Sequence, residues 1–142
     1  GQNKEKFVII CPESTSIKGL SDDFWNKIIE GLNNKGYTIY VNSVKGKYYK
    51  NAVTLNASIE EIFALSLKSN GIITMGSGLS VLLSFARQPM DVVYTELEVG
   101  KYKLTAEDVI DLYSLKYLPW EKNVTEYNYD ESGLVEKILN RY

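Results

Sequence analysis

Short apolar runs alternate with helix-type patterns along residues 7–94, and this alternation limits the possible folds more than any other feature of the sequence. The first run, Phe7–Cys11, is apolar throughout, as is typical of a strand that is buried on both faces of a parallel sheet. The other predicted strands are Tyr37–Val41, Ala52–Leu55, Gly71–Thr74 and Asp91–Tyr94. Strands that alternate with helices form parallel sheets with right-handed crossovers, so an α/β fold is predicted.

The helices between these strands are predicted from their start and stop signals. Ser21 or Asp22 caps a helix that ends at the stop signal Asn33–Gly36, with glycine just past the last turn. Ser58–Glu61 is a capping box, which begins a second helix. A third helix is predicted over Leu79–Arg87, before Gln88-Pro89 stops it.

The commonest strand order for such a chain is 3-2-1-4-5, so we expect one Rossmann-like, three-layer αβα domain over residues 1–142. Strands 1 and 4 then lie side by side, and the winding of the chain reverses between them. Ligands of open parallel sheets bind beyond the carboxyl ends of the strands at this reversal. The loops Pro12–Leu20 and Met75–Ser80 follow those two strands, so we expect a crevice between them.

The pattern weakens after Thr95. A short helix is predicted over Ala106–Tyr113, a strand that adds to the sheet over Val124–Tyr129, and a closing helix over Ser132–Asn140. This part of the chain is rich in tyrosine, which suggests that it packs over the sheet edge or against another domain. These tyrosines are Tyr102, Tyr113, Tyr117, Tyr127, Tyr129 and Tyr142.

The residue types that are missing exclude several chemistries. The chain contains no histidine and one cysteine, so Ser-His-Asp catalysis, Cys-His catalysis and His/Cys zinc sites cannot be assembled within it. It also has no Asp-x-Asp pair to hold a metal–diphosphate complex, and no metal cofactor is expected. Cys11 ends an apolar run and is interpreted as a buried core thiol.

Charge and hydropathy indicate the class of protein. The 16 basic and 18 acidic residues leave a net charge of −2, so no basic field is available for nucleic acid or an anionic membrane. No apolar run approaches the roughly 20 residues that cross a bilayer, and no signal-peptide apolar region is recognisable. We therefore expect a cytoplasmic protein. A core strand begins after only six residues, which suggests a domain of a longer protein.

The Gly76–Gly78 turn between a strand and a helix is the strongest candidate for a ligand site. Glycine lets a ligand approach the backbone, and the helix directs free N–H groups and its positive dipole end out of the turn. Ser77, Gly78 and Ser80 offer donors to a diphosphate, and Lys18 on the neighbouring loop offers a positive charge. Such a turn is also often only a packing device, so both interpretations stay open.

Two common phosphate motifs fail on inspection. The turn begins like a dinucleotide fingerprint, but Val81 stands where glycine or alanine is required. Gly31 and Gly36 have the spacing of a Walker loop, but Tyr37 follows instead of lysine. A Rossmann oxidoreductase and a P-loop NTPase are therefore not favoured.

Two stretches resemble the C-terminal, donor-binding half of GT-B glycosyltransferases, in particular the lipopolysaccharide heptosyltransferase-like family 9. The stretch Lys18–Trp25 keeps the lysine, an acidic residue and the terminal aromatic of a family segment that enters the first helix, but not its Trp-Pro pair. The turn Gly76–Val81 keeps Ser-Gly but replaces the family's acid with Gly76 and its histidine with Val81. The resemblance covers roughly residues 6–95, and the turn is also similar to those of other GT-B enzymes.

The resemblance implies a set of donor-binding residues. Those expected to bind the donor diphosphate are Ser14, Thr15, Lys18, Gly76, Ser77, Gly78, Leu79 and Ser80. Those expected to border the base or ribose are Asn56, Ala57, Ser58 and Glu96. No catalytic residue is assigned, because the missing acid and histidine leave the donor sugar open.

The resemblance also implies a function and partners. It implies glycosyl transfer from a nucleotide-diphosphate sugar to a glycan or lipid-linked acceptor in cell-surface polysaccharide biosynthesis, without metal. The acceptor site and general base would lie on a missing N-terminal domain, and the rest of the protein could place it at the inner face of the membrane. We expect this chain alone to bind nucleotide weakly and to transfer nothing. Two alternatives stay open: a non-catalytic α/β interaction or regulatory domain, and half of a GT-B-fold sugar-nucleotide epimerase.

Overall fold

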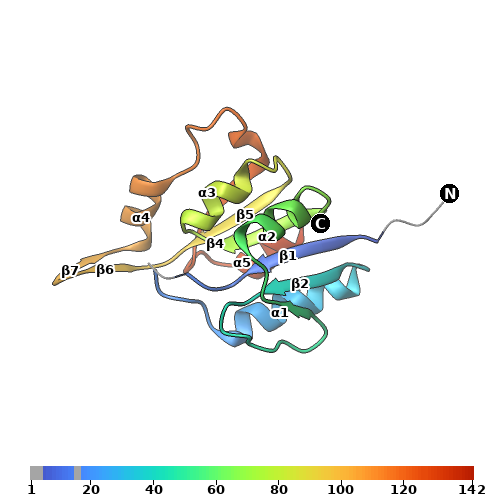
Figure 1. Ribbon diagram of the computed structural model, residues 1–142. Coiled ribbons are helices and arrows are strands. Elements are labelled where there is room, and N and C mark those ends of the chain that lie inside the picture. Colours follow the sequence, from blue (N-terminus) through green and yellow to red (C-terminus); the bar gives the residue numbers. More distant parts are fainter. Residues whose placement is uncertain (1–4, 15–16) are drawn as a thin grey trace.

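A six-stranded parallel sheet forms the centre of the computed structural model, which describes residues 5–14 and 17–142 (Figure 1). In spatial order its strands are β3 (Val53–Leu55), β2 (Thr38–Asn42), β1 (Phe7–Cys11), β4 (Gly71–Met75), β5 (Met90–Tyr94) and β8 (Val124–Asn128). The predicted order 3-2-1-4-5 with an added C-terminal strand is therefore confirmed. The winding reverses between β1 and β4, which pair in parallel from Val8 opposite Gly71.

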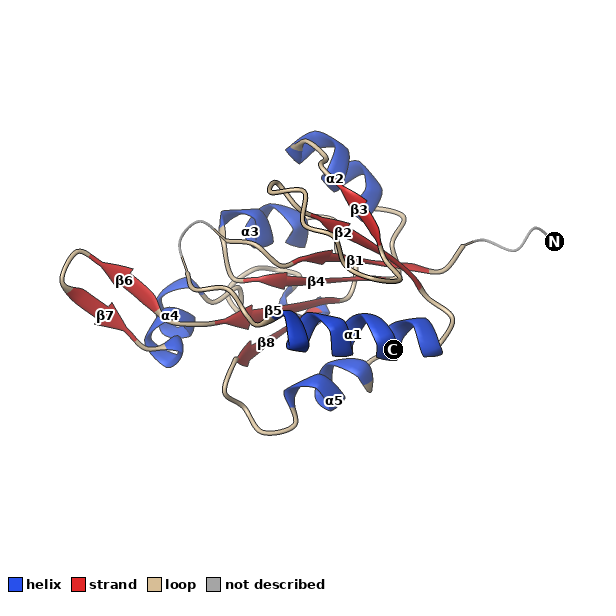
Figure 2. Cartoon of the chain, turned by 90° about the horizontal axis from the view of Figure 1, so that it is seen from below, coloured by secondary structure: helices blue, strands red, loops and turns tan. Residues whose placement is uncertain are grey.

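The middle of the sheet is apolar because it is covered on both faces. Every residue of β1, β4 and β5 is buried, including Cys11, the predicted core thiol. Helices α1 (Asp22–Asn34) and α5 (Leu134–Leu139) pack together on one face, while α2 (Ile59–Ser66) and α3 (Gly78–Ser84) cover the other (Figure 2). The result is the predicted three-layer αβα architecture.

The helix boundaries follow from capping. Ser21, not Asp22, caps α1, since its side chain accepts a hydrogen bond from the Phe24 N–H. Helix α3 begins at Gly78 and ends at Ser84, three residues before the predicted end at Arg87. The physical reason lies in the backbone, because Arg87 adopts a left-handed φ of 59° that an α-helix cannot contain.

The segment after β5 contains a hairpin that the sequence analysis did not predict. Strands β6 (Leu97–Val99) and β7 (Tyr102–Leu104) pair antiparallel and extend away from the sheet (Figure 1). Helix α4 (Ala106–Tyr113) follows as predicted and packs against β5 and β8, and the short 3-10 helix η1 (Glu121–Asn123) precedes β8. Leu97 is the buried residue of β6, so its three residues carried too little pattern for a strand prediction.

A buried carboxylate anchors the C-terminal residues to the amino end of the sheet. Asp91, near the start of β5, is fully buried and paired with the Arg141 guanidinium. It also accepts hydrogen bonds from the hydroxyls of Tyr127 at 2.9 Å and Tyr142 at 3.3 Å. Burial raises the pKa of Asp91, and Arg141 and the two tyrosines oppose that rise. The network lies at the opposite end of the sheet from the predicted crevice.

Candidate functional site

A crevice of about 520 Å³ lies at the carboxyl ends of β1, β2 and β4, where the winding of the sheet reverses. The loops that follow β1 and β4 separate there because the helices after them, α1 and α3, cover opposite faces. We call this space the crevice. It is lined by Glu13, Ser14, Asn42, Val44, Lys45, Ala57, Ile59, Ile62, Ser77, Gly78, Leu79 and Leu82.

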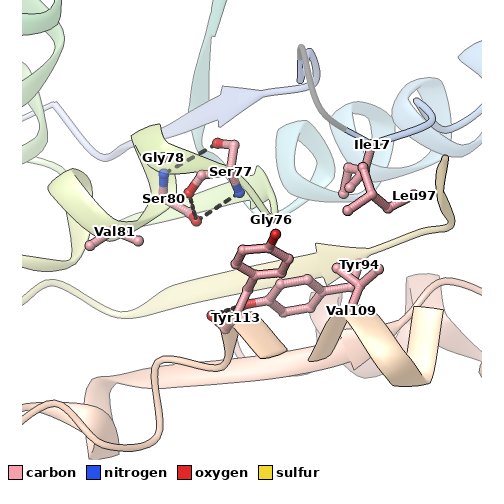
Figure 3. A pocket seen from close by; sticks show the side chains of 10 residues that line it. All are labelled: Ile17, Gly76, Ser77, Gly78, Ser80, Val81, Tyr94, Leu97, Val109 and Tyr113. Carbon is pink, nitrogen blue, oxygen red and sulfur yellow. Dashed lines mark hydrogen bonds between the residues drawn. The ribbon is translucent and has the colours of Figure 1, made fainter. Parts of the chain in front are cut away.

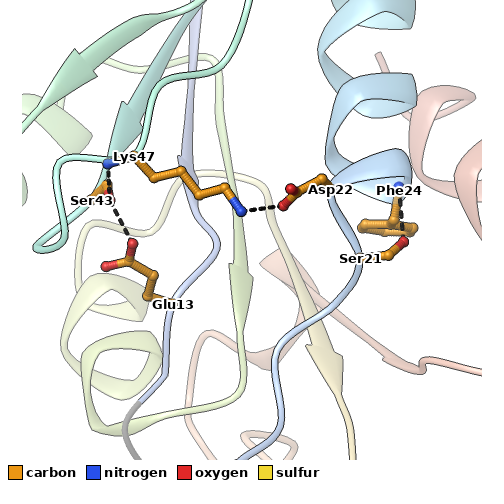
Figure 4. Close-up of polar contacts among 6 residues, drawn as sticks. All are labelled: Glu13, Ser21, Asp22, Phe24, Ser43 and Lys47. Carbon is orange, nitrogen blue, oxygen red and sulfur yellow. Dashed lines mark hydrogen bonds and ion pairs between the residues drawn. The ribbon is translucent and has the colours of Figure 1, made fainter.

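Glu13 holds two walls of the crevice together. One carboxylate oxygen accepts a hydrogen bond from the Ser43 hydroxyl, and the other accepts from the Val44 N–H at 2.9 Å (Figure 4). The Ser43 hydroxyl in turn accepts from the Lys47 N–H at 3.0 Å, and the Lys47 ammonium pairs with Asp22 at the start of α1. The loop after β2 is thereby attached to the loop after β1 and to α1.

Asn42, the last residue of β2, positions the predicted base or ribose loop. Its side-chain oxygen accepts a hydrogen bond from the Ala57 N–H at 2.9 Å, which places Ala57 in the crevice wall. Asn56 and Ser58 are exposed and lie outside the lining. The Ser58 hydroxyl accepts from the Glu61 N–H to cap α2, and hydrogen bonds from Ser58 lower the pKa of Glu61.

The Gly76–Gly78 turn reaches the crevice, but much of its hydrogen-bonding capacity is used internally. Ser77 and Ser80 form a capping box in which each side chain accepts the other's backbone N–H, at 3.0 Å and 3.3 Å. The Gly76 N–H donates to the Val93 carbonyl at 2.8 Å. Within the described part of the chain, the N–H groups of Gly78 and Leu79 have no protein acceptor, so both are available to a ligand.

Packing requires glycine at position 76, whereas position 78 has room for a side chain. A Cβ at Gly76 would lie 2.4 Å from the ring of Tyr94, whereas a Cβ at Gly78 would have nothing within 4 Å. The packing interpretation of the turn therefore holds for its first glycine. The second glycine leaves the backbone accessible from the crevice.

Lys18 and Glu96 lie next to each other, and neither residue lines the crevice. The Lys18 N–H donates to the Glu96 carbonyl at 3.1 Å, and the Thr95 hydroxyl donates to the Lys18 carbonyl. The Lys18 side chain is exposed, and the Glu96 carboxylate accepts from the Tyr129 hydroxyl at 2.8 Å. Of the remaining predicted residues, Ser14 lines the crevice and Thr15 lies outside the described residues.

Lys45 is a crevice residue that the sequence analysis missed. It lines the crevice from the loop after β2, beside Asn42 and Val44. A signal for it was present, because residues 42–51 form a lysine-rich loop directly after a predicted parallel strand. The carboxyl end of that strand lies next to the reversal point, and the same reasoning that selected Lys18 applies to Lys45.

A second cavity, of about 210 Å³, adjoins the same turn on its other side (Figure 3). We call it the apolar cavity. It is lined by Ile17, Gly76, Ser77, Gly78, Ser80, Val81, Tyr94, Leu97, Val109 and Tyr113. Ser77 and Gly78 line both the crevice and the apolar cavity.

Two further features of the structure concern metal ligands and membrane-spanning helices. Among residues 5–14 and 17–142, no group of three or more His, Cys, Asp or Glu side chains is arranged to hold a metal ion. Over the same residues, no helix has the length and apolar character to cross a membrane.

Structural comparison finds bacterial glycosyltransferases. The iron-containing dodecameric glycosyltransferase TibC from enterotoxigenic E. coli H10407 matches 67% of this chain and 28% of its own, with a TM-score of 0.56 and 21% identity. E. coli heptosyltransferase WaaC with ADP-2-deoxy-2-fluoro heptose matches 76% of this chain and 42% of its own, with a TM-score of 0.56 and 18% identity. E. coli ADP-heptose LPS heptosyltransferase II matches 78% and 46%, with a TM-score of 0.58 and 14% identity.

No protein-family model and no curated protein sequence matches the chain. The part of each glycosyltransferase that it matches is less than half of that enzyme. At these identities the likeness concerns the fold. The chain has the Rossmann-like α/β fold of one half of a GT-B glycosyltransferase.

Proposed function

We propose that this chain is the donor-binding half of a GT-B glycosyltransferase and binds a nucleotide-diphosphate sugar in the crevice. The reaction would transfer the sugar to a glycan or lipid-linked acceptor and release a nucleoside diphosphate. The acceptor site and the general base would lie on a second domain. The observation that carries the proposal is that Ser14, Ala57 and the Ser77–Leu79 turn, from three separate loops, line one crevice at the reversal point.

The charges in the crevice suggest how the donor would lie. Two phosphates need N–H donors and positive charge. The backbone of Gly78 and Leu79 supplies the donors from the start of α3, and Lys45 supplies the charge from the loop after β2. The Glu13 carboxylate repels a phosphate, and together with the Asn42 amide it suits ribose and base atoms. We therefore propose the diphosphate beside the Gly78 turn and the nucleoside toward Asn42 and Ala57.

The departure of a nucleoside diphosphate requires that its developing charge be neutralised. The lysine and the N–H groups at the start of α3 do this without a metal ion. Lys18 stays a candidate for the same role, because its side chain is exposed and lies in the same loop as Ser14. Lys18 and Lys45 are therefore alternative candidates for the lysine that contacts the phosphates, and single substitutions distinguish them.

The test is a titration of the ¹⁵N-labelled chain with UDP, GDP, ADP and CMP, followed by NMR shifts. We expect one or more nucleotides to shift the amides of residues 14–18 and 76–80, together with Ala57. Lys45→Ala should weaken diphosphate binding by about 1–3 kcal/mol, the size of a charge-assisted contact. Lys18→Ala should weaken it by as much only if Lys18 also reaches the phosphates. Lys68→Ala, an exposed lysine beyond α2, is the matched control and should change nothing.

A non-catalytic interaction domain is the second candidate, and one observation favours it. The Ser77 and Ser80 N–H groups, which a phosphate could use, are satisfied by the capping box. If no nucleotide shifts the crevice amides, in the chain alone and in the full-length protein that contains it, the donor-binding proposal is wrong and the interaction domain is favoured.

A further inference from the structure

The apolar cavity is separate from the crevice in its chemistry as well as its position. Its floor is the buried side chain of Val109, which is 1% exposed, with the buried side chains of Ile17 and Leu97 beside it. An isolated bridge pairs Ile17 with Leu97, so these two walls are held together by backbone hydrogen bonds. Val81 and Tyr113 stand at the rim, 41% and 56% exposed. The cavity is therefore open to solvent at one end and closed at the other.

Among the residues that the structure describes, the lining of the apolar cavity contains no aspartate, glutamate, lysine or arginine. The hydroxyls of Tyr94, Ser80 and Ser77 already have partners: Tyr94 donates to Glu126, Ser80 donates to the Ser77 carbonyl at 2.6 Å, and Ser77 accepts from the Ser80 N–H. A charged ligand group would lose its water there without gaining a partner of opposite charge. The cavity therefore favours an uncharged occupant.

One side chain leaves a hydrogen-bonding group free. Among the described residues, the Tyr113 hydroxyl has no hydrogen-bond partner, and the ring directs it across the apolar cavity toward the Gly76–Ser77 turn (Figure 3). Tyr94 and Tyr113 both line the cavity, and the Tyr94 hydroxyl lies 3.4 Å from the Tyr113 carbonyl, so two aromatic residues border the space (Figure 3). Aromatic rings pack favourably in offset or edge-on contact with other rings.

The size of the apolar cavity suits one or two rings. An apolar cavity of about 150 Å³ is known to stay dry and to take up benzene. The volume here is about 210 Å³. We propose that the apolar cavity is a binding site for a small, uncharged aromatic compound with one polar group that hydrogen-bonds to the Tyr113 hydroxyl. The site needs no phosphate, so it stands independently of nucleotide binding in the crevice.

The test compares two ligands of the same shape and different charge. p-Cresol and p-toluate are titrated into the ¹⁵N-labelled 142-residue chain. We expect saturable shifts with p-cresol at the amides of Ile17, Leu97, Val109 and Tyr113. p-Toluate should bind about tenfold more weakly or worse, because its carboxylate would be desolvated without a partner.

Three variants locate the site. Val81→Trp fills the rim from an exposed position that tolerates a large side chain, and should weaken p-cresol binding about tenfold or more. Tyr113→Phe removes only the hydroxyl and should weaken it about two- to tenfold, the range of one neutral hydrogen bond. Leu112→Ala, at the neighbouring position of α4 and 65% exposed, does not line the apolar cavity and serves as the control.

The possible results either support or overturn the proposal. Saturable binding that Val81→Trp weakens and Leu112→Ala leaves unchanged supports it. The absence of saturable shifts with p-cresol overturns it, as does equal binding of p-toluate or equal affinity in Val81→Trp. Each variant is first shown to be folded by its ¹H–¹⁵N spectrum. A parallel titration with UDP, GDP, ADP and CMP reports on the crevice. Failure of nucleotide binding in the crevice is therefore distinguishable from failure of p-cresol binding in the apolar cavity.

Discussion

Gly76 and Gly78 stand in one turn and serve different purposes, which only their surroundings reveal. A side chain at position 76 would meet the Tyr94 ring, and that ring is fixed because it is 1% exposed and its hydroxyl donates to Glu126. Position 78 faces open space at the junction of the crevice and the apolar cavity. At the scale of single residues, Gly76 therefore serves packing against Tyr94, and Gly78 leaves the backbone accessible to a ligand.

Alanine substitutions at the two glycines should have opposite effects on stability. Gly76→Ala is expected to lower the free energy of unfolding by about 1–3 kcal/mol, the usual cost of overpacking. Gly78→Ala is expected to raise it by up to about 1 kcal/mol, because alanine is the better helix former and its Cβ meets no atom. Urea unfolding of both variants measures the difference. Equal changes in the two variants would show that the contact with Tyr94 does not distinguish the two positions.

The second prediction at this scale concerns the ion pair between Asp91 and Arg141. Removal of one partner from a buried ion pair leaves an uncompensated charge, so Arg141→Ala should cost about 3 kcal/mol at neutral pH. We choose the lower end of the usual range because the Arg141 side chain is 28% exposed. Lys137→Ala, which breaks an exposed pair with Glu131, should cost less than about 1 kcal/mol and is the control.

The Arg141→Ala loss should depend on pH. Burial already raises the pKa of Asp91, and the loss of Arg141 raises it further. The folded variant then binds a proton more tightly than the unfolded chain, so its stability falls as pH rises from about 4 through the folded-state pKa. The difference in unfolding free energy between wild type and variant should therefore be smallest in acid and largest at neutral pH. A difference that is constant across this range would contradict a charge-based explanation.

At the scale of elements, three helices begin with a complete capping box, and at α3 this has a functional consequence. Helices α2, α3 and α4 start at Ser58, Ser77 and Thr105, whose side chains each accept the N3 backbone N–H. In α3 the N3 residue is Ser80, so the box is neutral and adds no carboxylate to the turn at the start of α3. A box with glutamate, like that of α2, would place a negative charge where the proposed diphosphate lies.

The cap of α2 can be tested without reaching the crevice, since Ser58 lies outside its lining. Ser58→Ala removes the acceptor for the Glu61 N–H and should lower the free energy of unfolding by about 1 kcal/mol. Ser58→Asp keeps an acceptor at the cap and should restore most of the loss. Thermal unfolding of the three proteins measures both effects. If Ser58→Asp is as unstable as Ser58→Ala, the hydroxyl contributes something other than a cap.

For the whole molecule, the arrangement of sheet and loops is consistent with the proposed function, in which this chain binds a ligand and does not turn it over. The crevice and the apolar cavity both open at the carboxyl end of the sheet, while the Asp91 network closes the amino end. A second domain facing the carboxyl end would complete an acceptor site. The chain contains no histidine to act as a general base, and in the proposed function that role falls to the second domain.

The corresponding prediction concerns activity. The 142-residue chain, incubated with UDP-, GDP- and ADP-sugars and a panel of glycan acceptors, should release free nucleotide no faster than a protein-free control. A nucleotide-release assay measures this, and binding by NMR shows that the same preparation is competent. Acceptor-dependent release by the chain alone would mean that its own residues supply the base, and the two-domain proposal would be wrong.

Much of the architecture was determined by the sequence itself, because local patterns carry it. The apolar run Phe7–Cys11 and the capping residues Ser21 and Ser58 indicated elements that the structure contains, and alternation of strands and helices led to the observed strand order. Such signals are readable because burial on both faces and helix capping each impose a residue type at a fixed spacing. The reversal point, and with it the position of the crevice, followed from topology alone.

Only the tertiary structure decided which side chains share that space. Lys18 and Lys45 follow neighbouring strands and look alike in the sequence, yet the backbone hydrogen bonds of Lys18 attach its loop to residues 95–97 while Lys45 enters the crevice lining. The apolar cavity likewise depends on Ile17, Leu97 and Val109, which come from three distant segments. Contacts between segments far apart in sequence leave no local periodicity, so the sequence by itself predicted the position of the crevice and the packed fold selected the residues that line it.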